Sequence, residues 1–119
     1  MPRCVDCFYI TDLLTFIINK MNVNFENIEI ANVDAGGGLT YHYNGLPFTG
    51  TIVEYNNNGE LIGEFNTKNG SKEGRIALYY NSGQIMDEHF EKDNRLYGIY
   101  KEWDENGNLL SEVDCGPQP

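Results

Sequence analysis

The chain has 119 residues, of which 40% are hydrophobic and 13% are aromatic, and its formal net charge is −10. This length suits one domain, and the apolar content argues against intrinsic disorder. Nucleic-acid phosphates and anionic lipid headgroups would be repelled by such a charge, so we expect no nucleic-acid partner and no stable membrane insertion. A small acidic domain of this kind attracts basic partners instead.

The three cysteines, Cys4, Cys7 and Cys115, argue against a disulfide-stapled secreted module, because their number is odd. Cys4 and Cys7 form a C-x-x-C pair, but the sequence has neither a second ligand pair for zinc nor a βαβ pattern for a redox motif. We therefore expect a reducing compartment, the cytoplasm, and no metal or cofactor. Whether this pair has any role is left open.

A short N-terminal helix is expected after Thr11, which can cap it. Its apolar stripe at helical spacing comprises Val5, Phe8, Tyr9, Leu13, Phe16 and Ile17. Several β-branched residues keep a strand as the alternative. Met21 is a possible second start, so it also stays open whether residues 1–20 belong to the fold.

Residues 1–40 are predicted to form an N-terminal cap made of that helix, a strand and a glycine-rich loop. Val23, Phe25, Ile28 and Ile30 alternate in two pairs, as residues in strands do. Residues 36–38 are all glycine and would connect this strand to the rest of the chain. At the other end, residues 115–119 contain two prolines and are expected to be a fraying tail.

A 24-residue recurrence dominates residues 41–114, with copies that begin at Gly50, Gly74 and Gly98. An aromatic residue follows each leading glycine by five positions, and a second glycine follows by nine. The aromatic residues are Tyr55, Tyr79 and Trp103, and the second glycines are Gly59, Gly83 and Gly107. A period of 20 to 50 residues is typical of repeat arrays.

Each copy is predicted to be one β-hairpin, because its second glycine closes an Asn- and Asp-rich turn between two short β-rich runs. Further turns at residues 68–71 and 92–95 would join one hairpin to the next. A lone hairpin cannot bury its aromatic residue, so we expect stacked hairpins to share Tyr55, Tyr79 and Trp103 as a column of rings. The fold class is therefore all-β: an antiparallel stack of hairpins capped by the short helix.

These residues resemble a known family, the MORN-type β-hairpin repeats, in the variant form of bacterial YwqK-like antitoxin proteins. The resemblance rests on the glycines and aromatic residues between Gly98 and Gly107, their two earlier copies, and residues 47–50. It covers residues 41–114. It implies an antitoxin or immunity protein that neutralises a partner toxin, and it implies little about sites, because the motif residues form turns and core.

No catalytic constellation is apparent, and we expect no enzyme. The two histidines, His42 and His89, are expected to be partly exposed strand residues, and no serine lies in a nucleophile elbow. Residues 104–108 with Glu112 have the wrong spacing for a calcium loop, which places glycine at position 6 and glutamate at position 12. An enzyme that uses Glu88, His89 or the cysteine pair remains the minor alternative.

Carboxylates are concentrated near the C-terminus, where residues 84–114 hold nine acidic residues against three basic ones. They either form a solvated face that protects edge strands or a docking surface for a basic protein. The candidate partner-binding residues are Tyr79, Glu88, Glu91, Trp103, Asp104 and Glu105. The leading hypothesis is thus a non-catalytic binder of a basic toxin. The alternative is a structural or membrane-associated repeat scaffold, which liposome flotation would reveal.

Overall fold

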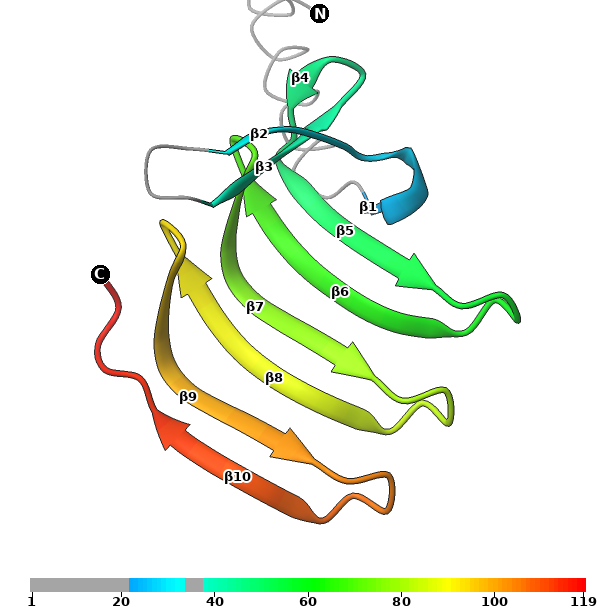
Figure 1. Ribbon diagram of the computed structural model, residues 1–119, viewed down its shortest axis with the longest axis vertical. Helices are drawn as coiled ribbons and strands as arrows, with labels where there is room; N and C mark the ends of the chain where they lie inside the picture. The colour runs from blue at the N-terminus through cyan, green and yellow to red at the C-terminus, as the bar shows by residue number, and fades with distance from the viewer. Residues whose placement is uncertain (1–21, 34–37) are drawn as a thin grey trace, which may run out of the picture.

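The protein is mainly β-sheet in the computed structural model, which describes residues 22–33 and 38–119 (Figure 1). Within these ranges, the one helical element is a 3₁₀ turn, η1 (Phe25–Asn27). The N-terminal helix that we expect after Thr11 lies outside the described residues, as do Cys4 and Cys7. The expected all-β fold is therefore confirmed for the described residues, whereas the helical cap stays a prediction.

The larger sheet has seven strands in the order β1-β5-β6-β7-β8-β9-β10. The strands are β1 (Asn22–Asn24), β5 (Gly50–Tyr55), β6 (Leu61–Lys68), β7 (Ser71–Tyr79), β8 (Ile85–Lys92), β9 (Arg95–Trp103) and β10 (Leu109–Asp114). From β5 onward every pair is antiparallel, and each strand lies beside the next one in the chain. The short β1 adds a parallel edge beside β5.

A smaller sheet of β2 (Glu29–Val33), β3 (Leu39–Tyr43) and β4 (Leu46–Pro47) crosses the end of the larger one near β5, β6 and β7 (Figure 1). The backbone of Gly70, in the β6–β7 turn, joins the two sheets by bonding to Tyr41 at 2.8 Å and Phe48 at 2.9 Å. The strand predicted around residues 23–30 is interrupted by η1, because the Asn24 side chain accepts the amide hydrogen of Glu26 and bends the chain. Its two halves enter different sheets.

The hairpin turns predicted from the second glycines are confirmed. The amide of Gly59 donates to the Asn56 carbonyl at 3.0 Å, and the amide of Gly107 donates to the Asp104 carbonyl at 3.1 Å. The middle turn closes in the same way, through Gly83. Each of these glycines has a positive φ, which a residue with a side chain rarely adopts. At the opposite end, two-residue turns at 69–70 and 93–94 join one hairpin to the next, as predicted.

The larger sheet has two chemically different faces, because paired residues share a face and successive residues alternate. We call them the Ile52 face and the Ala77 face. Across the Ile52 face runs one row of paired residues: Val23, Ile52, Phe65, Ile76, His89, Tyr100 and Val113. The row therefore begins in aliphatic and aromatic residues, becomes more polar at His89 and Tyr100, and ends in the apolar Val113 of β10.

The main buried cluster lies where the small sheet covers the start of this row. Ile52 is 0% exposed, and Val23, Tyr41 and Phe48 pack with it. The rings of Tyr41 and Phe65 meet edge to face, 5.2 Å apart. Burial of these side chains supplies the main driving force for bringing the two sheets together.

Bulges at two of the leading glycines bend the strands, which curve strongly in Figure 1. Residues 73–75 stand opposite Asn66 alone, and residues 98–100 stand opposite His89 alone. Each bulge therefore adds two residues to the longer strand. Because two is an even number, side chains before and after the bulge keep their faces, while the strand bends. Gly98 also bonds to the two residues that follow β10. Its carbonyl accepts from the amide of Cys115 at 2.8 Å, and its amide donates to the carbonyl of Gly116 at 2.7 Å. The expected fraying is thus wrong for the start of the tail.

Candidate functional site

A row of aromatic and aliphatic side chains lies on the Ala77 face at the hairpin-turn end of the sheet. It consists of Tyr55, Leu61, Tyr79, Ile85, Trp103 and Leu109, which we call the turn-end row. None of the six is buried: Tyr55 is 44% exposed, Leu109 is 50% exposed, and the others are half-buried. The row therefore offers apolar area to a partner along three hairpins.

The three rings of this row do not touch one another, contrary to the column expected from the sequence. Aromatic contacts in the described part of the chain occur elsewhere, for example between Phe90 and Tyr97 at 5.8 Å. The reason is spacing: Tyr55, Tyr79 and Trp103 lie two strands apart, and adjacent strands are about 4.8 Å from each other. The intervening strands β6 and β8 place the aliphatic residues Leu61 and Ile85 between successive rings of the row.

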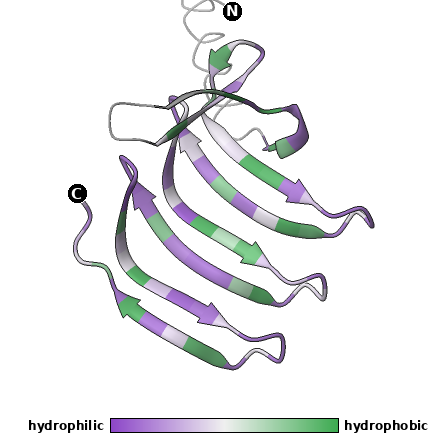
Figure 2. Cartoon of the chain, viewed as in Figure 1, coloured by the Kyte–Doolittle hydropathy of each residue, from purple (hydrophilic) through white to green (hydrophobic). Residues whose placement is uncertain are grey.

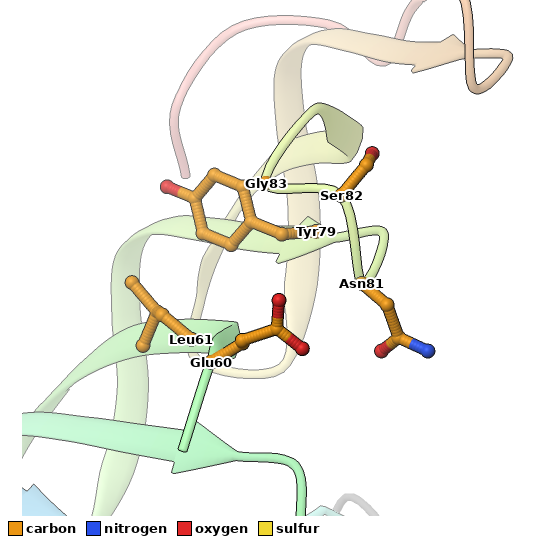
Figure 3. Close-up of a pocket in the computed structure, with 6 residues that line it drawn as sticks. All are labelled: Glu60, Leu61, Tyr79, Asn81, Ser82 and Gly83. Atoms are coloured by element: carbon orange, nitrogen blue, oxygen red, sulfur yellow. The ribbon is translucent and has the colours of Figure 1, made fainter. Parts of the chain in front are cut away.

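An open hollow of about 330 Å³ lies beside the turn-end row, between the first two hairpin turns (Figure 3). Leu61 and the Tyr79 ring line it from one side, and residues 81–83 form part of its rim. The turns themselves are tied together. Asn56 donates to Asn81 across the first pair at 3.0 Å, and the Tyr80 hydroxyl donates to the Trp103 carbonyl at 2.8 Å. The row thus sits on a turn edge linked from hairpin to hairpin.

Carboxylates flank the turn-end row on the same face. Next to it runs the row of Val53, Glu64, Ala77, Glu88, Lys101 and Glu112. The Tyr79 hydroxyl donates to Glu64 at 2.8 Å, and burial together with this hydrogen bond raises the pKa of Tyr79. Arg75 donates to Glu88, a bond that raises the pKa of the guanidinium. Glu112, at the free end, is exposed.

The structure brings together most of the predicted partner-binding residues and separates one. Tyr79, Glu88 and Trp103 share the Ala77 face, and Asp104 and Glu105 lie in the turn that follows Trp103. By contrast, Glu91 lies three residues after Glu88 and points to the Ile52 face.

Three of the four predicted acids, Asp104, Glu88 and Glu91, already interact with groups within the chain, so they are less available to a partner. Asp104 accepts the backbone amides of Asn106 and Asn108, both at 2.9 Å, and the hydrogen bonds from Asn108 lower its pKa. It therefore stabilises the turn, in agreement with the hairpin interpretation of residues 104–108. Glu88 pairs with Arg75. Glu105 is exposed, with no bond within the described residues.

A second cluster, which the sequence does not predict, lies on the Ile52 face. His89 sits between two carboxylates of its own strand, with Nδ1 2.7 Å from Asp87 and Nε2 3.1 Å from Glu91. Its ring stacks on Tyr100, and the Tyr100 hydroxyl donates to Asp87 at 2.8 Å. His89 is a partly buried strand residue whose side chain is 12% exposed, at the low end of the partial exposure that we expect.

The titratable groups around His89 come from three strands. Asp87 and Glu91 lie on β8, Lys72 of β7 approaches Glu91 at 3.9 Å, and Tyr100 lies on β9. Burial opposes a charge on His89, but the hydrogen bonds to Glu91 and Asp87 outweigh it and raise the pKa of His89. The bond from His89 lowers the pKa of Glu91, and the bond to Asp87 raises the pKa of Tyr100 to about 12.

This geometry limits what the His89 cluster can do chemically. Both ring nitrogens are bonded to carboxylates, so neither is free to take a proton from a substrate. Glu88 lies on the other face of the sheet and cannot assist His89. Within residues 22–33 and 38–119, no group of three or more His, Cys, Asp or Glu side chains is arranged to hold a metal ion.

The described segments also contain no helix with the length and apolar character that crossing a bilayer requires. Comparison of the chain with protein-family models, curated protein sequences and solved structures finds no match. Its function is therefore inferred from the residues themselves.

Proposed function

We propose that this chain is a non-catalytic protein-binding module of the cytoplasm that neutralises a basic partner protein, as an antitoxin or immunity protein would. The turn-end row is the binding surface, and the carboxylates beside it attract the partner. The proposal agrees with the resemblance of residues 41–114 to MORN-type repeats of the antitoxin group. In this view the three hairpins are copies of one repeat, which presents an aromatic residue at the same place in each copy.

The observation that carries this proposal is the partial exposure of a continuous apolar row beside acidic side chains. Aromatic residues that lose the rest of their water contact on binding are typical energetic centres of protein interfaces. Tyr55, at 44% exposure, and the half-buried Trp103 still have such area to bury. Surrounding carboxylates speed the encounter with a basic protein and disfavour acidic ones.

The test is affinity capture of partner proteins from the native host with the wild-type chain and matched variants. Tyr55→Ala and Trp103→Ala remove the first and the last aromatic side chain of the turn-end row. Ile30→Ala is the control, because Ile30 is an equally exposed apolar residue, at 50%, on the small sheet. We expect one basic protein to be retained by the wild type and the control and to be lost with both row variants.

Neutralisation is tested by co-expression, in which the captured protein slows growth alone and the wild-type chain restores it. Retention of the same protein by all four chains would contradict the proposal, and so would the absence of any basic protein. Vesicles of anionic lipid form a further arm. Flotation of the chain with them at low salt would favour the membrane-associated scaffold instead.

A further inference from the structure

The last strand of the larger sheet, β10, presents a free edge with exposed apolar side chains. Among residues 22–33 and 38–119, it lies at the end of the strand order and pairs with β9 alone (Figure 1). Leu109, Leu110 and Val113 are 50%, 66% and 53% exposed. In Figure 2 both ends of β10 are coloured as hydrophobic. Natural sheet edges are often kept short or carry charged side chains, and β10 has two such charges, Glu112 and Asp114. With six residues, three of them exposed and apolar, the edge is only partly protected.

The backbone of β10 has donors and acceptors that point away from β9. The amide of Cys115 donates to the Gly98 carbonyl, so it points toward β9. Because the direction of these groups alternates along an antiparallel strand, the amides of Glu112 and Asp114 point outward. Another strand could therefore pair with β10 without displacing any bond of the sheet.

The side chains of β10 define what such a strand should carry on each face. Val113 continues the row of the Ile52 face beyond Tyr100, whereas Glu112 and Asp114 lie on the Ala77 face. Both acids are exposed, and only Lys101 offsets them on the neighbouring strand. A residue opposite Val113 should therefore be apolar, and residues opposite the two acids should be basic.

We propose that β10 binds an extended segment of the partner protein by strand addition, and that this segment alternates apolar with basic residues. This inference rests on the proposed function and identifies how the basic partner is recognised. Main-chain hydrogen bonds supply the pairing, and the alternation fixes the register. Leu109 belongs to both β10 and the turn-end row, so the added strand extends the same binding surface.

A second copy of this chain is the other conceivable occupant of the edge. An antiparallel pairing of two β10 strands would bring Glu112 and Asp114 of both copies together on one face. Like charges placed opposite each other destabilise such a pair, and a net charge of −10 on each chain adds to the repulsion. Charge complementarity therefore favours the basic segment.

The experiment measures binding of two labelled short peptides to the full chain by fluorescence anisotropy. In one, lysine and valine alternate; in the other, the same residues stand in separate blocks. We expect the alternating peptide to bind about tenfold more tightly, because only it pairs with both faces of β10 at once. Hydrogen exchange should show new protection at the amides of Glu112 and Asp114.

Two variants separate main-chain pairing from charge. Glu112→Pro removes an outward amide that the sheet does not use, and an edge strand tolerates this change. Glu112→Gln removes only the charge. The proline variant should lose the preference for the alternating peptide, whereas the glutamine variant should keep it and bind both peptides more weakly. Sedimentation at the same concentrations should show a monomer.

Equal binding of the two peptides, protection confined to other strands, or a dimer that buries β10 would overturn this inference. These outcomes differ from failure of the proposed function. A captured toxin that is lost with Trp103→Ala but is held equally well by Glu112→Pro and Glu112→Gln would leave the binding module standing without strand addition. Absence of any basic partner would remove the proposed function itself.

Discussion

The ring of His89 stacks on the ring of Tyr100 from the neighbouring strand, with centroids 4.7 Å apart and planes inclined by 15°. These two residues occupy, one period later, the places that Phe65 and Ile76 hold in the preceding hairpin pair. A polar stack thus interrupts the apolar row of the Ile52 face before Val113. The hydrogen bonds from His89 to Asp87 and Glu91 stabilise this stack most while His89 carries its proton.

His89 should make the free energy of unfolding depend on pH. Because its pKa is raised in the folded state, its contribution is complete below the unfolded value of about 6.5 and is lost as pH rises through the folded value. The lowered pKa of Glu91 acts in the opposite sense, so its contribution is lost in acid as pH falls through that folded value. Stability should therefore be greatest in weakly acidic solution.

The variant His89→Gln should lower the free energy of unfolding by about 1.5–3 kcal/mol at pH 6, because hydrogen bonds to charged groups are lost. The loss should be smaller at pH 8.5. Urea unfolding across this pH range measures both values. His42→Gln is the matched control, since His42 lies in the small sheet away from the cluster. If His89→Gln lowers the free energy of unfolding equally at all pH values, the interpretation that folded His89 is protonated is wrong.

The Tyr100 hydroxyl should contribute to the free energy of unfolding although it carries no charge. Asp87 is only 6% exposed, so Tyr100→Phe leaves a buried carboxylate oxygen without its donor. We expect a loss of about 1–3 kcal/mol in the free energy of unfolding. The control is Tyr55→Phe, whose hydroxyl is exposed and should change stability by less than about 0.5 kcal/mol. Ultraviolet titration should also lose the tyrosine with a pKa of about 12.

The sequence predicts the hairpins well because their turns depend on local chemistry. Asparagine, aspartate and glycine at residues 56–59 and 104–107 favour positive φ whatever surrounds them. The placing of Tyr79 and Trp103 on one face likewise follows from the 24-residue spacing, since the two residues hold equivalent positions in successive hairpins. Local sequence patterns therefore predict each hairpin and the face on which its aromatic residue lies.

The sequence does not predict what packs between hairpins. Alternation along one strand places Asp87 and Glu91 on the same face as His89, and alignment of His89 with the core residue Phe65 is a second signal in the sequence. Nothing local shows that Tyr100 joins them. Its position depends on the bulge that places residues 98–100 opposite one residue of β8. Likewise, the expected column of rings failed because strand spacing, which is tertiary, separates Tyr55 from Tyr79.

The buried start of the Ile52 face should carry most of the stability of the fold. Ile52 is fully buried against Val23, Tyr41 and Phe48, so Ile52→Ala removes apolar contacts and leaves a cavity. We expect a loss of about 2–5 kcal/mol, measured by chemical denaturation. Leu110→Ala removes a side chain that is 66% exposed and should cost less than about 0.5 kcal/mol. Equal losses would show that the core lies elsewhere.

The bulge at Gly98 should be sensitive to any side chain, for conformational and not steric reasons. Its φ is +67°, while a Cβ placed there would meet nothing closer than Phe90 at 3.8 Å. Gly98→Ala should therefore cost about 1–2 kcal/mol, the penalty for a left-handed residue. It should also raise hydrogen exchange at Cys115, whose amide depends on the Gly98 carbonyl.

Gly63 provides the matched control for Gly98, because it lies inside β6 outside the left-handed region and its added Cβ would make an ordinary contact with Leu78 at 3.4 Å. Gly63→Ala should be neutral or stabilise the fold by about 0.4–1 kcal/mol, since alanine restricts the unfolded chain. Asparagine tolerates the left-handed region better than alanine does, so Gly98→Asn should recover part of the loss. Similar losses for Gly98→Ala and Gly63→Ala would indicate crowding, not backbone strain, as the reason for glycine at the bulge.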